Sequence, residues 1–290
     1  MDFIKINTQL DHMSAEECGL ECKAPEFIDS HDHEAVRKEF LYAGIVLVEN
    51  CEEQSLIQLA QHLGEPVQPR NETTSGTCVS NIRCAPGLEG KGYSSEELFF
   101  HTDRSGWSHP PKILTTAMKT ASGDGGHSLF ADGRSMITYL REHEPELYEI
   151  VTSAKHSSFK AEDGKFVPRP IFDTATGILR LRLDDGIQLS AALTDAFPTL
   201  RNAIYKYAFS VSLAEGQGYV LDNHRFLHGR TAFSGAREVL RILAFEGQGR
   251  EEDLGEDGAQ QGIAGSPLLE VATEDEDINP EIGLNSMQTR

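Results

Sequence analysis

Residues 99–107 read FFHTDRSGW, and two aromatic residues here lead into a histidine and an aspartate that stand two positions apart. Residues two apart on an extended chain point to one face, so His101 and Asp103 project together while Thr102 projects away. An imidazole and a carboxylate on one face are suitable ligands for a divalent first-row metal. The triplet alone is a weak signal, because it also fits an ordinary strand end. A metal site here requires a third ligand later in the chain.

Residues 221–233, LDNHRFLHGRTAF, offer His224 and His228 as that third ligand. Two histidines and one carboxylate leave one face of an octahedron open, the arrangement with which non-haem Fe(II) activates oxygen. Arg237 and Arg241 follow in REVLR, and residues four apart on a strand share a face. A guanidinium there can bind one carboxylate of a dicarboxylate co-substrate whose other end chelates the metal.

Hydrophobic periodicity predicts the elements on either side of these motifs. Helices are expected within residues 33–43, 52–63, 133–154 and 190–210, and strands within 45–50, 110–121, 124–133, 177–186, 211–229 and 236–247. Strands dominate the second half, while helices cluster at the start and in one insertion around 133–210. We therefore predict a mainly β protein with flanking helices, a jelly-roll barrel and not alternating β-α units.

The stretches HTD (101–103), GGHSLFADGR (125–134), LDNHRFLHGRTAF and REVLR resemble the Fe(II)- and 2-oxoglutarate-dependent dioxygenases of the taurine dioxygenase (TauD/TfdA) superfamily. The wording DNHRFLHGR is closer to its clavaminate-synthase-like branch, although that branch commonly has Glu where Asp103 stands. The similarity runs from about Gly44 to Phe245. It implies a double-stranded β-helix, or distorted jelly roll, with the site inside its mouth.

The resemblance also implies roles for individual residues. It places the metal on His101, Asp103 and His228, which leaves His224 as a less favoured rival. A hydroxyl of the glycine-led turn, here Ser128, would contact the side-chain carboxylate of 2-oxoglutarate. Arg237 matches the main carboxylate clamp, and Arg241 matches its supporting or substrate-facing neighbour. The implied cofactors are Fe(II), 2-oxoglutarate as co-substrate and O2.

Substrate-binding residues are harder to identify from the sequence. Arg104 and Trp107 follow the metal motif and are expected to border the substrate pocket, although Trp107 fits a core anchor equally well. In residues 177–186, GILRLRLDDG, alternation would place Arg180, Arg182 and Asp184 on one face of a strand. That face is either the solvent-exposed side of a sheet or the site that binds the carboxylate and amine of an amino-acid-like substrate.

The composition limits the partners. A formal net charge of -20 argues against nucleic acid, which needs a cationic surface. No apolar run approaches membrane-spanning length. Five cysteines without a dense framework suggest reduced thiols in a cytoplasmic protein. The expected partner is thus a small-molecule substrate, and the sequence makes no prediction of oligomeric state.

The charge also suggests where the folded part ends. Residues 251–290 hold 11 of the 46 acidic residues and one basic residue, so residues 1–250 carry a net charge of -10. We predict a single dioxygenase domain over residues 1–250 and an acidic, flexible tail over 251–290.

The function that these observations favour is oxidative decarboxylation of 2-oxoglutarate to succinate and CO2, coupled to hydroxylation of a small polar substrate. An amino acid, its derivative or a natural-product intermediate is expected, and desaturation or cyclisation would use the same centre. The alternative is a non-catalytic jelly-roll protein that binds a metal or ligand. Arg237 disfavours it, because a structural metal has no use for a carboxylate clamp.

Overall fold

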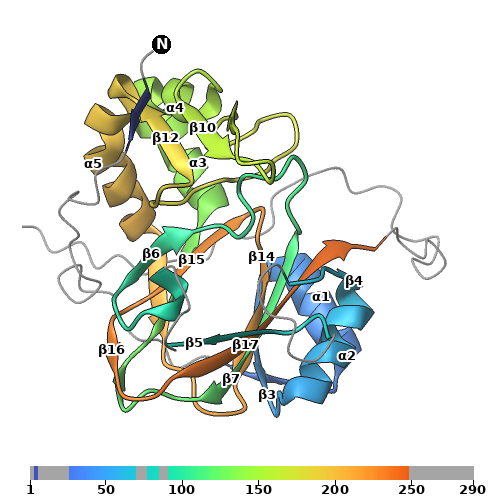
Figure 1. Cartoon of the computed structure of the whole chain (residues 1–290). Coiled ribbons are helices and arrows are strands. Elements are labelled where there is room, and N and C mark those ends of the chain that lie inside the picture. The colour runs from blue at the N-terminus through green and yellow to red at the C-terminus, as the bar shows by residue number, and fades with distance from the viewer. Residues whose placement is uncertain (1–2, 6–25, 70–76, 85–90, 248–290) are drawn as a thin grey trace, which may run out of the picture.

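The computed structural model describes residues 3–5, 26–69, 77–84 and 91–247 (Figure 1). The acidic residues 251–290, expected to form a flexible tail, lie outside the described residues, as do Cys18 and Cys22. No helix in the described part of the chain is long and apolar enough to cross a membrane.

Two antiparallel sheets face each other and form the double-stranded β-helix that the sequence predicted. The larger sheet has the order β2 (Ile28–Asp29), β3 (Ile45–Glu49), β14 (Gly218–Asp222), β7 (Ile113–Thr120), β17 (Glu238–Glu246) and β4 (Gly64–Pro66), and β5 (Ser80–Arg83) also pairs with β17. Only its β2–β3 pair is parallel among the described strands. The smaller sheet has the order β13 (Ala208–Val211), β9 (Ser128–Asp132), β15 (Phe226–Arg230) and β6 (Leu98–His101). Two-residue strands β8 (Asp124–Gly125) and β16 (Phe233–Ser234) form a separate pair.

Alternation along the central strands of the larger sheet separates two apolar layers. One face packs toward the smaller sheet with Leu114, Met118, Tyr219, Leu221, Val239 and Leu243. The other face packs against the first two helices with Ile113, Ala117, Val220, Leu240, Ile242 and Ala244. Thr116 and Arg241 are register partners and stand at inward positions of this pattern. The period of two therefore places one arginine inside the barrel.

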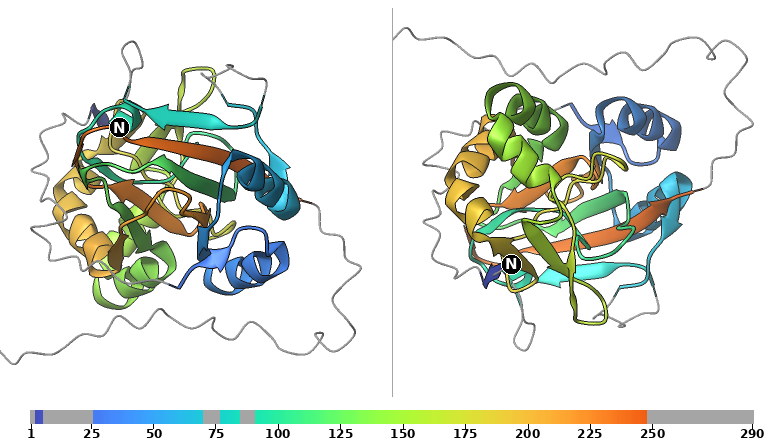
Figure 2. Two further views of the ribbon diagram at one scale, coloured as in Figure 1. Left: turned by 90° about the horizontal axis from the view of Figure 1, so that it is seen from below. Right: turned by 90° about the horizontal axis from the view of Figure 1, so that it is seen from above.

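Helices α1 (His33–Ala43) and α2 (Glu53–Leu63) cover the outer face of the larger sheet (Figures 1 and 2). The Asp32 carboxylate caps α1 by accepting a hydrogen bond from the Ala35 N–H. Gly44 ends α1 in the left-handed region, with φ of 78°. Both helices and the strand after Gly44 confirm the sequence expectation.

The insertion forms a second lobe on the other side of the sheets (Figure 2). It contains α3 (Gly133–His143), α4 (Pro145–Thr152) and α5 (Ala191–Lys206). It also contains β10 (Ser157–Lys160), β11 (Phe166–Pro168) and β12 (Ile187–Ser190), which pair with each other and with β1 (Phe3–Lys5). The insertion is thus mixed and not purely helical. Residues 133–154 form two helices because Pro145 starts a new helix and restricts Glu144 before it.

The strand predicted for residues 177–186 is wrong. This segment is irregular, apart from an isolated bridge between Phe172 and Leu179. Its backbone groups bond to separate parts of the chain: the Leu179 N–H donates to His224, the Arg180 N–H to Ile171 and the Leu181 N–H to the Thr102 hydroxyl. No single neighbouring strand offers it a ladder, so side-chain alternation did not produce a strand.

Candidate metal centre and co-substrate cavity

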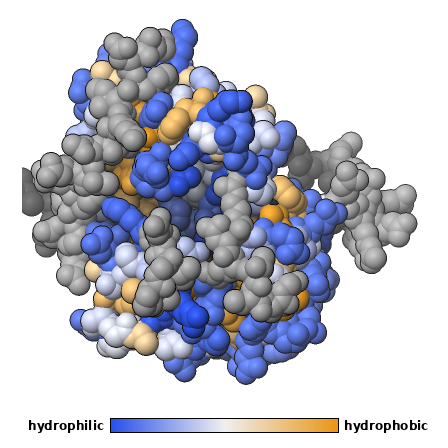
Figure 3. Space-filling model, viewed as in Figure 1, coloured by the Kyte–Doolittle hydropathy of each residue, from blue (hydrophilic) through white to orange (hydrophobic). Residues whose placement is uncertain are grey.

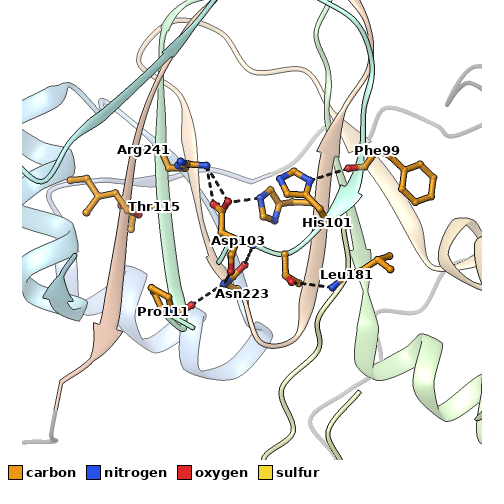
Figure 4. Close-up of polar contacts among 11 residues, drawn as sticks. Phe99, His101, Asp103, Pro111, Thr115, Leu181, Asn223 and Arg241 are labelled. Carbon is orange, nitrogen blue, oxygen red and sulfur yellow. Dashed lines mark hydrogen bonds and ion pairs between the residues drawn. The ribbon is translucent and has the colours of Figure 1, made fainter. Parts of the chain in front are cut away.

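Three side chains meet at the mouth of the barrel: His101 and Asp103 of the first motif, and His228, which the family resemblance favoured over His224. His101 ends β6, His228 lies in β15, and the two residues are register partners across this strand pair. Asp103 follows two residues after β6. One ligand atom from each of the three side chains lies within 4.8 Å of the others. The structure therefore brings together the two imidazoles and the carboxylate that the motifs singled out (Figure 4).

The hydrogen bonds of the cluster leave suitable atoms for a metal. The Nδ1 of His101 lies 2.9 Å from the carbonyl oxygen of Phe99, which can only accept, so Nδ1 carries the proton and Nε2 is left as a ligand. The Nε2 of His228 lies 3.8 Å from Oδ2 of Asp103. Two imidazole nitrogens and a carboxylate oxygen suit Fe(II), so the residues present fit the ion that the motifs suggested.

Two buried side chains fix the segment that carries Asp103 (Figure 4). The Asn223 amide accepts a hydrogen bond from the Asp103 N–H at 2.8 Å and donates to the carbonyls of Asp103 and Pro111. Asn223 is fully buried. The Thr102 N–H donates to the carbonyl of Leu181, and the Thr102 hydroxyl accepts from the Leu181 N–H. These bonds explain why Thr102 points away from the two ligands.

The electrostatics keep the three side chains in the protonation states that a metal needs. Burial, reinforced by the nearby His101, lowers the pKa of His228 to about 3. Burial likewise lowers the pKa of His101. Burial alone would raise the pKa of Asp103, but Arg241, His228 and His101 together bring it to about 2. At neutral pH the cluster is therefore two neutral imidazoles and one carboxylate.

A cavity of about 400 Å³ opens from this cluster. Figure 3 shows hydrophilic residues around the hollow at the centre of the face drawn. Ser128, Arg237 and Arg241, the residues expected at the co-substrate, all line the cavity. Arg237 makes no ion pair with any carboxylate of the described residues, and its Nε has no hydrogen-bond partner there. A half-buried guanidinium without a counter-ion is suited to an anion that enters the cavity.

A second arginine strengthens the case for an anion near Arg237. Arg230 is 4% exposed and donates to backbone carbonyls, including those of Glu96 and Ser94. The guanidinium carbons of Arg230 and Arg237 lie 4.7 and 5.7 Å from the ring centroid of Phe233. Burial and the charge of Arg237 lower the pKa of Arg230 to about 10. Two like charges at one ring repel each other, and an anion beside them would relieve that repulsion.

Arg241 occupies a different position. Its Nη1 lies 3.1 Å from each carboxylate oxygen of Asp103 (Figure 4). Arg241 therefore holds the Asp103 carboxylate, while Arg237 has its charge available to the cavity. This geometry favours Arg237 as the carboxylate clamp.

Four of the five residues expected at the substrate line the cavity, and the fifth does not. Arg104, Trp107, Arg182 and Asp184 line the cavity. Arg180 is not among its lining residues: it is 2% exposed and donates to the carbonyl of Ser108 at 3.0 Å. The expectation that Arg180 shares a face with Arg182 and Asp184 is thus wrong, because the segment is not a strand.

His224, the rival metal ligand, lies elsewhere. Its Nε2 is 2.8 Å from the carbonyl oxygen of Pro110, and it lines a second cavity with Asp222 and Arg225. Sequence reasoning missed Asn223, Arg230 and Lys160. Asn223 and Arg230 stand inside the motif that supplied His228, and that position was a signal in the sequence. Lys160 lies in no motif, and only its charge was visible.

The fold and site define a class: a double-stranded β-helix with two histidines, one carboxylate and an arginine-lined cavity at its mouth is the arrangement of a non-haem Fe(II) oxygenase. The model of the "Taurine catabolism dioxygenase TauD, TfdA family" matches residues 7–243. The chain therefore belongs to this family.

Individual relatives are distant. γ-Butyrobetaine dioxygenase of Homo sapiens is 25% identical over 171 residues, which are 52% of this chain and 44% of that protein. Trimethyllysine dioxygenase of Meyerozyma guilliermondii is 24% identical over 169 residues, 51% of this chain and 42% of that protein. The match thus spans less than half the length of these curated relatives.

Solved structures share the fold. Asparagine oxygenase, in complex with Fe(II), 3-hydroxyasparagine and succinate, aligns with a TM-score of 0.62 at 17% identity, covering 75% of this chain and 79% of that one. The non-heme iron oxygenase OrfP, in complex with iron and α-ketoglutaric acid, aligns with a TM-score of 0.58 at 17% identity, covering 73% and 80%.

Proposed function

We propose that this protein is an Fe(II)- and 2-oxoglutarate-dependent oxygenase that hydroxylates, desaturates or cyclises a small polar molecule. Decarboxylation of 2-oxoglutarate to succinate and CO2 would accompany oxidation of the substrate by O2. The observation that carries the proposal is the meeting of His101, Asp103 and His228 within 4.8 Å in a cavity that Arg237 also lines. Relatives named for asparagine and trimethyllysine support an amino acid or its derivative as the starting point for a search.

The roles of the chain's own residues follow from the geometry. His101, Asp103 and His228 would hold the iron, and Arg241 would keep the Asp103 carboxylate ionised and oriented. Arg237 would bind the terminal carboxylate of 2-oxoglutarate through charge-assisted hydrogen bonds, and the hydroxyl of Ser128, which lines the same cavity, would be a further donor. The bound iron and 2-oxoglutarate supply the redox chemistry, and the protein supplies orientation and a sheltered cavity.

Burial also sets the state of Tyr219, which lines the same cavity. It raises the pKa of the Tyr219 phenol to about 12, so the phenol stays neutral at physiological pH. A neutral phenol near Arg237 can donate a hydrogen bond without adding charge to the site.

The direct test is succinate formation. The protein is incubated with Fe(II), 2-oxoglutarate and air, with and without candidate substrates, and succinate is measured alongside a gain of one oxygen or a loss of two hydrogens in the substrate. We expect succinate from the native protein and none without iron. Iron binding without any succinate, across a broad set of substrates, would overturn the proposal in favour of a binding protein.

We propose a reducing, cytoplasmic setting for this reaction. The described cysteines, Cys51, Cys78 and Cys84, are free thiols. Cell fractionation, with trapping of thiols before lysis, tests this: thiols found oxidised in a secreted fraction would contradict it.

A further inference from the structure

The cavity carries a large excess of positive charge, although the protein as a whole is strongly acidic. Among the described residues that line it, seven are lysine or arginine and two are aspartate: Lys91, Arg104, Lys160, Arg182, Arg230, Arg237 and Arg241, against Asp103 and Asp184. Iron(II) and the 2-oxoglutarate dianion would cancel each other's formal charge, so loading the proposed cofactors leaves this excess in place. Part of this charge is satisfied within the protein, because Arg230 donates to backbone carbonyls and Lys160 lies 4.0 Å from Oδ2 of Asp185 in an exposed ion pair. The charge that remains suits an anion besides 2-oxoglutarate.

Part of the excess lies away from the carboxylate clamp. Lys160, which ends β10, and Arg182 belong to the insertion, whereas Arg230 and Arg237 belong to the barrel. The insertion packs closely against the segment that follows Asp103. A Cβ atom added to Gly106 would lie 2.0 Å from the carbonyl oxygen of Lys160, so only glycine allows this approach. Arg104, in that segment, adopts a left-handed backbone with φ of 54°, which is uncommon for a residue other than glycine.

Arg182 is held in place before any ligand arrives. Its Nε and Nη2 each lie 2.5 Å from an oxygen of Asp184, and the same carboxylate accepts the Gly186 N–H at 2.9 Å. Its guanidinium also packs on Gly186, where an added Cβ would lie 2.4 Å from the guanidinium carbon. Because Asp184 occupies one edge of the fork, the remaining N–H groups of Nη1 are directed elsewhere.

The same arrangement leaves few carboxylates that could bind a cationic ligand. Among the described lining residues the only carboxylates are Asp103, in the metal cluster, and Asp184, which is paired with Arg182. A quaternary ammonium group is usually bound over aromatic faces. The guanidinium of Arg104 already lies over the Trp107 ring, 5.2 Å from its centroid. Tyr93, Phe99 and Tyr219 also line the cavity, but they lie outside the insertion. At Arg104, Lys160 and Arg182, a trimethylammonium group would meet three like charges.

We propose that the substrate carries an anionic group, a carboxylate, sulfonate or phosphate, that binds at the insertion side of the cavity to Arg104, Lys160 and Arg182. This inference rests on the proposed function and names its substrate class. A quaternary ammonium group, as in the names of the γ-butyrobetaine and trimethyllysine relatives, would be repelled by like charge at these three residues.

A binding experiment tests the inference without turnover. Trp107 is the only tryptophan of the chain and lines the cavity, so its fluorescence reports occupancy directly. Protein loaded with Fe(II) and saturating 2-oxoglutarate, without oxygen, is titrated with four-carbon probes that differ in their end group: butanesulfonate, butylphosphonate, pentanoate, butanol and butyltrimethylammonium. We expect the anions to bind, more weakly as salt is added, and the alcohol and the ammonium not to bind. The order among the three anions identifies which anionic group the site prefers.

Variants assign the binding to the insertion. Lys160→Gln and Arg182→Gln should each weaken the preferred anion about tenfold, the loss expected for one charge-assisted hydrogen bond. Lys155→Gln, an exposed lysine of the same lobe outside the cavity lining, is the matched control and should have no effect. Arg182→Lys keeps the charge and should recover part of the affinity, which separates charge from mere disturbance of Asp184.

The outcomes distinguish the two proposals. Equal binding of butyltrimethylammonium and butanesulfonate, or a Lys160→Gln variant that behaves like Lys155→Gln, would overturn the anionic-substrate inference. Binding of 2-oxoglutarate is measured on the same samples by calorimetry. If 2-oxoglutarate itself fails to bind the Fe(II)-loaded protein, the proposed function fails, whatever the probes do.

Discussion

At the scale of single residues, the metal cluster makes a prediction that separates two histidines of one motif. His228→Ala or His101→Ala removes one of three ligands, so we expect loss of Fe(II) binding and of succinate formation with the fold retained. His224→Ala removes only a hydrogen bond to Pro110 and should keep most of the iron. Iron is measured after desalting, and circular dichroism checks the fold. Iron lost from His224→Ala and kept by His228→Ala would reverse the assignment.

Arg237 makes a second prediction at this scale. Arg237→Ala should raise the 2-oxoglutarate concentration for half-saturation by about 10- to 100-fold, because a bidentate charge-assisted contact is lost. Iron binding should change much less, since Arg237 does not contact the metal cluster. Arg237→Lys should recover only part, because an ammonium cannot form the planar fork. The assay is a 2-oxoglutarate titration at fixed iron.

Arg241 supplies the comparison for that titration. It contacts Asp103 and not the proposed clamp position, so Arg241→Ala should weaken iron binding more than Arg237→Ala does. An unchanged half-saturation in Arg237→Ala together with a large rise in Arg241→Ala would move the clamp to Arg241.

At the scale of elements, a buried ion pair ties the strand that carries His228 to its surroundings. Arg225, just before β15, donates to both oxygens of Asp132, the N-cap of α3, and also to the carbonyl of Ala43 at the end of α1. The two side chains are 9% and 3% exposed. Arg225→Met leaves the Asp132 charge buried without its partner, and we expect a loss of about 3–5 kcal/mol in unfolding free energy.

The pH dependence of that loss has a definite sign. Burial alone would raise the pKa of Asp132, but the hydrogen bonds and charge of Arg225 lower it below its ordinary value. The pair therefore stabilises the native protein above the unfolded pKa of 3.8, and this stabilisation is lost as the pH falls through the lower native pKa. Without Arg225, burial raises the pKa of Asp132 in the native state. Protonation of Asp132 at low pH then removes the unpaired buried charge, so acid reduces the stability difference between the variant and the native protein. Urea unfolding at several pH values should show the gap between the two proteins narrowing below about pH 4, and a gap that widens there would contradict this account.

Arg141→Gln is the matched control. Arg141 lies in α3, and its contact with Glu142 is long, 4.0 Å, and exposed. An exposed pair of this kind contributes about 0–1 kcal/mol, so this variant should unfold almost as the native protein does.

Elements also show what the sequence could and could not predict. The strand that carries Arg241 was predictable because it is a short, nearly continuous apolar run, as expected of a strand with both faces buried. The His–x–Asp segment and the late histidine were predictable as a set because the metal constrains residue type. Residues 177–186 do alternate, yet they form no strand, since their backbone partners come from three different segments. The local sequence pattern indicates which side chains are apolar, but it does not indicate whether a neighbouring strand is available for pairing.

At the scale of the whole molecule, local sequence pattern likewise could not predict which residues meet in the cavity. Arg182 and Lys160 are far apart in sequence from His101 and enter the site only because the insertion folds back over the barrel mouth. Their charge was visible in the sequence, but their convergence depends on tertiary packing. The sequence therefore indicated the cluster of His101, Asp103 and His228 better than it indicated the insertion side of the cavity.

The acidic segment after the last strand leads to a prediction about the whole chain. We propose that the catalytic unit ends near β17, whose last residue is Glu246, and the family match ends at residue 243. A chain ending at Arg250 should fold and form succinate. Its net charge falls from -20 to -10, because residues 251–290 carry 11 acids and one base. Since 2-oxoglutarate is a dianion, the shorter chain should bind it more tightly at low salt, and the difference should disappear near 0.5 M salt, where charges are screened within a few ångströms.

The control is a full-length chain whose Glu and Asp residues in 251–290 are replaced by Gln and Asn. It should behave like the shorter chain if charge alone is responsible. Loss of folding on truncation would show that residues 251–290 belong to the folded unit, and a salt-independent difference would show that they act on the site by contact and not by charge.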